Sequence, residues 1–207
     1  MASNGLDGIP CRTQLCDMRI LCRLTICLVA VAGLSATPAA LRAQISLLNN
    51  DRLIEAVNAN DLATAETLLG KGHFTEVVDE KRRTPLILAA SRGHEDLVDA
   101  LVRFRANVNA ADEFGNTALF YAASGDHIGI IEILLEAEAA IDAKNRQGVT
   151  ALMGASSSGR LAAVEKLLAN KADPAETDFT GRTARDWASR NNRRLVVDIF
   201  ERRGIRN

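Results

Sequence analysis

The sequence predicts an all-α solenoid of stacked helix-turn-helix units with extended loops between them. A 33-residue pattern returns along the chain, and its opening threonines stand at positions 84, 117, 150 and 183 without an insertion. A fixed period of this length is typical of proteins in which each unit is too small to bury its own apolar face and needs its neighbours. We therefore expect units at about 51–83, 84–116, 117–149, 150–182 and 183–207.

The first helix of a unit is predicted to begin just after its threonine. Thr84 supplies an acceptor oxygen at the N-cap, and Pro85 suits the first helical position because its nitrogen has no hydrogen to donate. Leu86 then combines with Ala89 and Ala90 to form a packed face. The two small side chains let the helix of the next unit approach closely.

A second helix and an extended loop complete the unit. The helix is predicted from Glu95 to about Arg103, with apolar residues at spacings of one, three and four that can face both neighbouring units. The tip of the following loop runs from Asp112 to Gly115, where glycine suits a positive φ angle. The first unit has Arg82 in place of that glycine, so we expect its loop to take a different turn.

Charge is distributed unevenly along the repeats. Residues 183–207 hold seven arginines against three acids, whereas residues 44–182 hold fourteen basic and twenty-one acidic residues. The sequence thus predicts an acidic body with a basic end. The simplest interpretation of these arginines is the solvated face of a C-terminal cap.

Residues 1–43 lie outside the repeats and have the order of a secretory signal peptide. Arg19 and Arg23 precede an uncharged run over residues 24–41, and small residues follow at its end. All four cysteines lie in this segment, so a processed chain would form no disulfide, which suits an oxidising compartment. Met18 is our preferred start of the natural chain, which would make residues 1–17 an upstream extension.

The fate of this segment has two interpretations. Cleavage after Ala43 would leave Gln44 as the first residue, and cuts after Ala39 or Ala40 are alternatives. An uncleaved membrane anchor is the other interpretation, because 18 uncharged residues could just span a bilayer.

The repeated motifs resemble those of the ankyrin-repeat family over about residues 51–207. The resemblance rests on Thr-Pro-Leu at 84–86, the alanine pair at 89–90, Gly-His at 93–94 and the Asp-x-x-Gly turns. It implies a non-catalytic module that binds a protein through a concave groove and its loop tips. The family's histidine after Thr-x-Leu is replaced by Ile87, Phe120, Met153 and Asp186. The hydrogen bonds of that imidazole must be absent or replaced, so we expect less rigid loops.

No set of residues predicts catalysis, a cofactor or a metal. His94 and His127 occupy equivalent turns, no two histidines have ligand spacing on one helix, and no cysteine follows the leading segment. The serines at 156–158 lack the glycine-flanked turn of a nucleophile, and an acidic body disfavours nucleic acid. An enzyme remains the alternative class, which a catalytic pair in a pocket would support.

Candidate partner-binding residues form two sets. The residue two after each unit's leucine is expected to face the groove, and the residues at this phase are Leu88, Tyr121, Gly154 and Trp187. The three large side chains form either an anchor for a partner or a cover for the groove within the fold. The loop tips supply the second set, in which two phenylalanines stand where water is expected: Glu80, Lys81, Glu113, Phe114, Arg146, Gln147 and Phe179.

These observations together predict an exported, monomeric protein-binding module. The plain form of the signal indicates a bacterial protein, and we expect it in the periplasm or secreted. The alternative is a scaffold anchored in the inner membrane, with the same binding surface held at the bilayer.

Overall fold

The computed structural model describes residues 52–71 and 75–205. The chain divides into a unit of residues 1–43 and a unit of residues 44–207, and all the described residues belong to the second. The predicted signal peptide therefore lies outside the described residues. Within the described ranges the regular elements are helices, apart from one isolated antiparallel bridge between Ala111 and Thr117. The all-α prediction is confirmed for this part of the chain.

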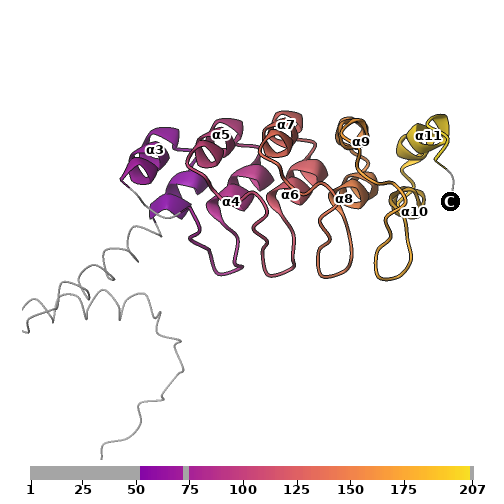
Figure 1. The fold of residues 1–207 in the computed structure, drawn as a ribbon, viewed down its shortest axis with the longest axis horizontal. Coiled ribbons are helices and arrows are strands. Elements are labelled where there is room, and N and C mark those ends of the chain that lie inside the picture. The colour runs from indigo at the N-terminus through magenta and orange to yellow at the C-terminus, as the bar shows by residue number, and fades with distance from the viewer. Residues whose placement is uncertain (1–51, 72–74, 206–207) are drawn as a thin grey trace, which may run out of the picture. The chain divides into compact units, whose positions relative to one another are not determined.

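Pairs of short helices follow one another along the described chain (Figure 1). Residues 52–58 are helical and pair with α3 (Leu62–Gly70). The remaining pairs are α4 (Pro85–Arg92) and α5 (Glu95–Arg103), α6 (Ala118–Gly125) and α7 (Ile128–Glu136), α8 (Ala151–Ser158) and α9 (Leu161–Ala169), and α10 (Ala184–Arg190) and α11 (Arg194–Arg202).

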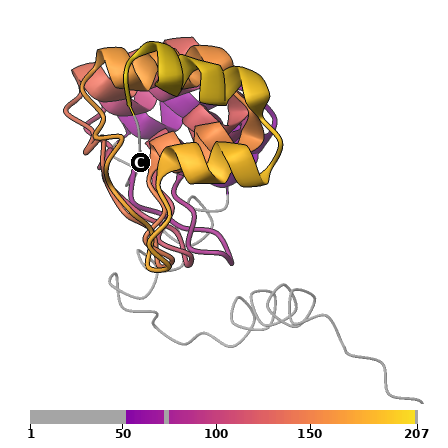
Figure 2. The same cartoon turned by 90° about the vertical axis from the view of Figure 1, so that its right-hand side faces the viewer.

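The helices of the stack form two layers. The first helices, α4, α6, α8 and α10, pack in series, and so do the second helices, α3, α5, α7, α9 and α11. The extended loops project from the side of the first helices, and the view along the stack shows them gathered on one side (Figure 2). Among the described residues no helix is long and apolar enough to cross a membrane.

Threonine caps begin the first helices as the sequence predicts. The hydroxyl oxygen of Thr84 accepts a hydrogen bond from the Ile87 N–H, and Pro85 occupies the first turn. The threonines at 117, 150 and 183 make the same contact with the N–H three residues later. Ala89 and Ala90 are fully buried, as expected for small side chains where helices of successive units meet.

The described loop tips share one turn. Asp79, Asp112, Asn145 and Asp178 each accept, through Oδ1, the backbone N–H groups two and four residues later, at 2.8–3.0 Å. The residue three positions after each of them has a positive φ, which is 58° at Arg82 and 79–81° at the three glycines.

The prediction of a different first turn is therefore wrong. Asp79 makes the same pair of hydrogen bonds as its counterparts, and these hold Arg82 in the left-handed region. A side chain in that region costs about 1–2 kcal/mol, which two hydrogen bonds to a carboxylate can offset.

Candidate protein-binding surface

Backbone hydrogen bonds join each loop tip to the next. The N–H of Glu113 donates to the Lys81 oxygen at 3.2 Å, that of Arg146 to the Phe114 oxygen at 3.0 Å, and that of Phe179 to the Gln147 oxygen at 3.1 Å. The residues concerned fall into two rows that recur every 33 positions. We call this surface the tip ladder, and it consists of Glu80, Lys81, Glu113, Phe114, Arg146, Gln147, Phe179 and Thr180.

The tip ladder brings together all seven loop residues that the sequence selects. Its phenylalanines are open to solvent, with Phe179 74% and Phe114 49% exposed. Phe179 lies over Gly148 of the preceding loop, where a Cβ atom would come within 2.8 Å of the ring. The other members of the tip ladder are charged or polar residues. The ladder thus combines large apolar side chains with charges of both signs.

Side-chain hydrogen bonds add to the ties between loops. The Asn145 amide donates from Nδ2 to the Asn116 Oδ1 at 2.9 Å, and the Lys144 ammonium donates to the Thr177 carbonyl oxygen at 3.0 Å. These bonds join neighbouring loops, and the expectation of less rigid loops stays a prediction.

Tyr121 and Trp187 link the loops to the first helices. The Tyr121 hydroxyl donates to the Asp112 Oδ2 at 2.6 Å, and burial followed by the hydrogen bond to Asp112 raises the pKa of this tyrosine above its ordinary value. The indole N–H of Trp187 donates to the Asp178 Oδ2 at 3.1 Å, and the Arg182 guanidinium lies 4.2 Å from the centre of its ring. Both residues are half-buried, and each bonds a turn carboxylate.

Leu88 does not lie on the open surface. It is only 1% exposed and belongs to the apolar core, which corrects the expectation that it anchors a partner. The reason is its chemistry. Leucine has no polar atom with which to bond a turn carboxylate, as Tyr121 and Trp187 do at Asp112 and Asp178, so it packs in the core.

The sequence-based reasoning missed the turn carboxylates as organising residues. Asp112 and Asp178 are 5% and 4% exposed, and each connects a loop tip to an aromatic ring of the next helix. The signal that could have found them is an aspartate or asparagine at the same place in each period, at positions 79, 112, 145 and 178.

The two histidines that the structure describes lie at the starts of second helices. His94 and His127 precede α5 and α7 as N-cap residues without a side-chain capping bond. The His127 ring lies over Gly93 of the preceding unit, where a Cβ atom would be 2.7 Å from the ring. Among the residues that the structure describes, no group of three or more histidine, cysteine, aspartate or glutamate residues could hold a metal ion.

Comparison with known families agrees with the helical stack. A family model described as ankyrin repeats in three copies matches residues 53–145, and one described as ankyrin repeats in many copies matches residues 134–188. Together they cover more than half of the chain without a gap. Among curated proteins none matches the sequence. The 33-residue period, the paired helices and both matches agree that the chain is an ankyrin-repeat protein.

Proposed function

We propose that this chain is an exported, non-catalytic module that binds a partner protein through the tip ladder and the neighbouring groove. Ankyrin repeats are generally protein–protein interaction modules, which supports the binding role. One observation carries the choice of surface: two exposed phenylalanines stand on loops whose backbones are hydrogen-bonded to one another.

The physics of the tip ladder suits recognition. Large aromatic side chains supply much of the energy of protein interfaces, and Phe114 and Phe179 have area left to bury. The hydrogen bonds between tips order the surface before a partner arrives, which lowers the entropy lost on binding. The surrounding charges, Glu80, Lys81 and Arg146, then select among partners.

The half-buried rings extend this surface towards the helices. Tyr121 and Trp187 are partly exposed, and their polar atoms donate hydrogen bonds to Asp112 and Asp178. We assign them a contact role secondary to that of the tip phenylalanines. Their removal would also release the turn carboxylates, so they are poor test positions.

The test compares two tip substitutions with a matched control. Phe114→Ala combined with Phe179→Ala should abolish recovery of the partner from an extract of the source cells. Phe104→Ala removes a phenylalanine that is 40% exposed at the end of α5, outside the tip ladder, and should leave recovery intact.

The recovered partner is then purified, and its dissociation constant is measured with each variant. The double substitution should weaken binding by at least about tenfold, as removal of interface anchors does. Equal affinity of the wild type and the double variant would refute the tip ladder as the binding surface.

Export has its own test, which is the intact mass of the protein expressed from the whole sequence. A soluble exported species beginning near Gln44 would support a cleaved signal. A membrane species that retains residues 24–41 would instead support the anchored scaffold, with the same surface held at the bilayer.

A further inference from the structure

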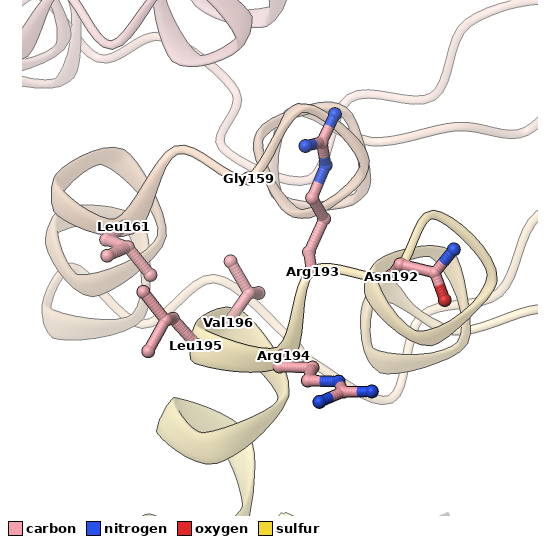
Figure 3. Close-up of a pocket in the computed structure, with 7 residues that line it drawn as sticks. All are labelled: Gly159, Leu161, Asn192, Arg193, Arg194, Leu195 and Val196. Carbon is pink, nitrogen blue, oxygen red and sulfur yellow. The ribbon is translucent and has the colours of Figure 1, made fainter.

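A second candidate surface lies where α11 begins. A hollow of about 300 Å³ opens between the last two units (Figure 3), and its lining comes from the end of α8, the start of α9 and the start of α11. We call it the C-terminal hollow, and its lining residues are Gly159, Leu161, Asn192, Arg193, Arg194, Leu195 and Val196. A neighbouring hollow of about 370 Å³ shares Asn192, Arg193 and Arg194 with it.

The corresponding junction two units earlier is covered. There the Glu95 carboxylate lies against Gly129, so the start of α7 is shielded by a side chain of α5. In the last two units Leu161 and Leu195 stand at those two positions, and Leu195 is 64% exposed. The apolar wall of the C-terminal hollow is therefore open to an incoming side chain.

Positive charge without a partner lies at this hollow. Arg194 lines it, and Arg190 ends α10 next to Ser189, which lines the neighbouring hollow. Both side chains are exposed and have no hydrogen bond or ion pair among the described residues. Arg194 also stands at the first position of α11, where the helix dipole disfavours a cation, whereas the guanidinium of the N-cap Arg193 donates to the Ser157 carbonyl oxygen at 3.0 Å. Residues whose placement opposes such a local preference, without an interaction that offsets it, are expected at functional sites.

We propose that the C-terminal hollow binds an acidic segment of a partner protein. The segment would insert one large apolar side chain between Leu161 and Leu195, and its carboxylates would lie against Arg194 and Arg190. The interaction combines apolar burial with charge complementarity, which sets both orientation and the rate of encounter.

Other anionic partners fit the surface less well. Asp198 lines the neighbouring hollow, and Glu201 lies one turn further along α11. These acids interrupt the positive surface, whereas a bilayer or a phosphate backbone is continuously negative. A second copy fits less well because several acids on its second helices are already paired, Asp99 and Glu66 with Arg103 and Glu132 with Lys166.

The experiment measures fluorescence anisotropy with a labelled probe peptide, a short run of glutamates with one central leucine. The protein is the full chain as recovered from expression of the whole sequence. Arg194→Glu should weaken binding of the peptide by about tenfold or more, because it places like charges opposite each other. Leu195→Ser should weaken it by about tenfold through lost apolar burial. Neither site is in the core, so both variants should keep the wild-type unfolding transition.

Matched controls make the result specific. Arg105→Glu reverses an exposed arginine that has no ion pair among the described residues and should leave the affinity within about twofold. A probe peptide with glycine in place of leucine should bind about tenfold more weakly to the wild type. The tip ladder lies on the loops, so Arg194→Glu should leave the partner of the tip ladder bound. A failure of the hollow proposal can therefore be told apart from a failure of the tip-ladder proposal.

Three outcomes would overturn the proposal. Equal weakening by Arg105→Glu would mean attraction to overall charge only. Equal binding of the glycine peptide would remove the apolar contact. Binding to phosphatidylcholine vesicles containing phosphatidylglycerol, lost in Arg194→Glu, without binding of either peptide would assign the surface to a membrane.

Discussion

At the scale of single residues, the buried carboxylate of Asp178 accepts hydrogen bonds from three neighbours, Thr180, Arg182 and Trp187. Burial opposes ionisation of this group, but the hydrogen bonds from Thr180 and Arg182 outweigh it and hold the pKa of the carboxyl well below its ordinary value of 3.8. The turn of the last loop therefore depends on a charge that the folded chain stabilises.

The pH dependence of stability follows from this depressed pKa. As pH falls below about 4, the unfolded chain binds a proton at Asp178 while the folded chain does not, so the free energy of unfolding decreases. Above that pH the contribution is complete. Asp178→Asn should lower the free energy of unfolding at neutral pH by about 1–3 kcal/mol, because two donors lose their acceptor. It should also flatten the decrease below pH 4.

Urea titrations at several pH values measure both effects. Asp79 keeps its own depressed pKa beside Arg83, so part of the acid dependence should remain in the variant. Glu165→Gln, which changes an exposed carboxylate in the middle of α9 without a hydrogen-bond partner among the described residues, is the control and should change neither quantity. An unchanged low-pH slope in Asp178→Asn would contradict the assigned role of this carboxylate.

At the scale of single elements, the loops show which glycines are required by packing. Gly148 and Gly181 have nearly equal φ angles of 79° and 81°. A Cβ atom at Gly148 would lie 2.7 Å from the Phe179 backbone nitrogen, whereas one at Gly181 would meet nothing within 4 Å. Backbone strain alone therefore acts at Gly181, and strain together with a clash acts at Gly148.

Alanine substitutions at these two glycines separate strain from loop stacking. Gly181→Ala should lower the free energy of unfolding by about 1–2 kcal/mol through the positive φ. Gly148→Ala should cost at least about 1 kcal/mol more, since the nitrogen atom in contact belongs to the backbone and cannot rotate away. Urea unfolding measures the difference, and equal losses would show that the fourth loop does not rest on the third.

Helix α8 contains a serine where α4 and α6 have alanine. The Ser156 side chain is fully buried, and its hydroxyl has no hydrogen-bond partner among the described residues. The equivalent residues Ala90 and Ala123 are also fully buried. The hydroxyl therefore adds a desolvation cost without a compensating bond.

Ser156→Ala should raise the free energy of unfolding by about 1 kcal/mol or more. Thermal and urea unfolding report the change. Ser158→Ala, a half-exposed position at the end of the same helix, provides the control and should change stability by less than about 0.5 kcal/mol. A loss of stability in Ser156→Ala would mean that the buried hydroxyl has a partner.

At the scale of the whole molecule, the period made the stacked architecture predictable. Threonine caps, alanine contacts and loop tips all recur every 33 residues, and each has a local cause that the sequence displays. The prediction for Leu88 was wrong because leucine has no polar atom to bond a turn carboxylate, as Tyr121 and Trp187 do in their units, and its side chain packs in the core. The prediction for Arg82 was wrong because the hydrogen bonds of Asp79 outweigh the preference of the turn for glycine.

The candidate binding surface was only partly predictable, because its arrangement depends on packing between units. The exposed phenylalanines could be selected from their places in the loops, because turns between helices are expected in water. Their arrangement along one hydrogen-bonded edge depends on the offset between successive loops, which follows from helix packing. The C-terminal hollow depends on which side chain covers each junction, as Glu95 does at Gly129, and no repeat pattern displays that.

The central claim is that a protein partner binds along the tip ladder. The most direct measurement is amide hydrogen exchange of the full chain with and without the purified partner. Our account predicts that partner binding slows exchange at the loop tips, residues 79–83, 112–116, 145–149 and 178–182, and leaves it unchanged in the second helices α5, α7 and α9. Slower exchange confined to these second helices, with the loop tips unchanged, would contradict it.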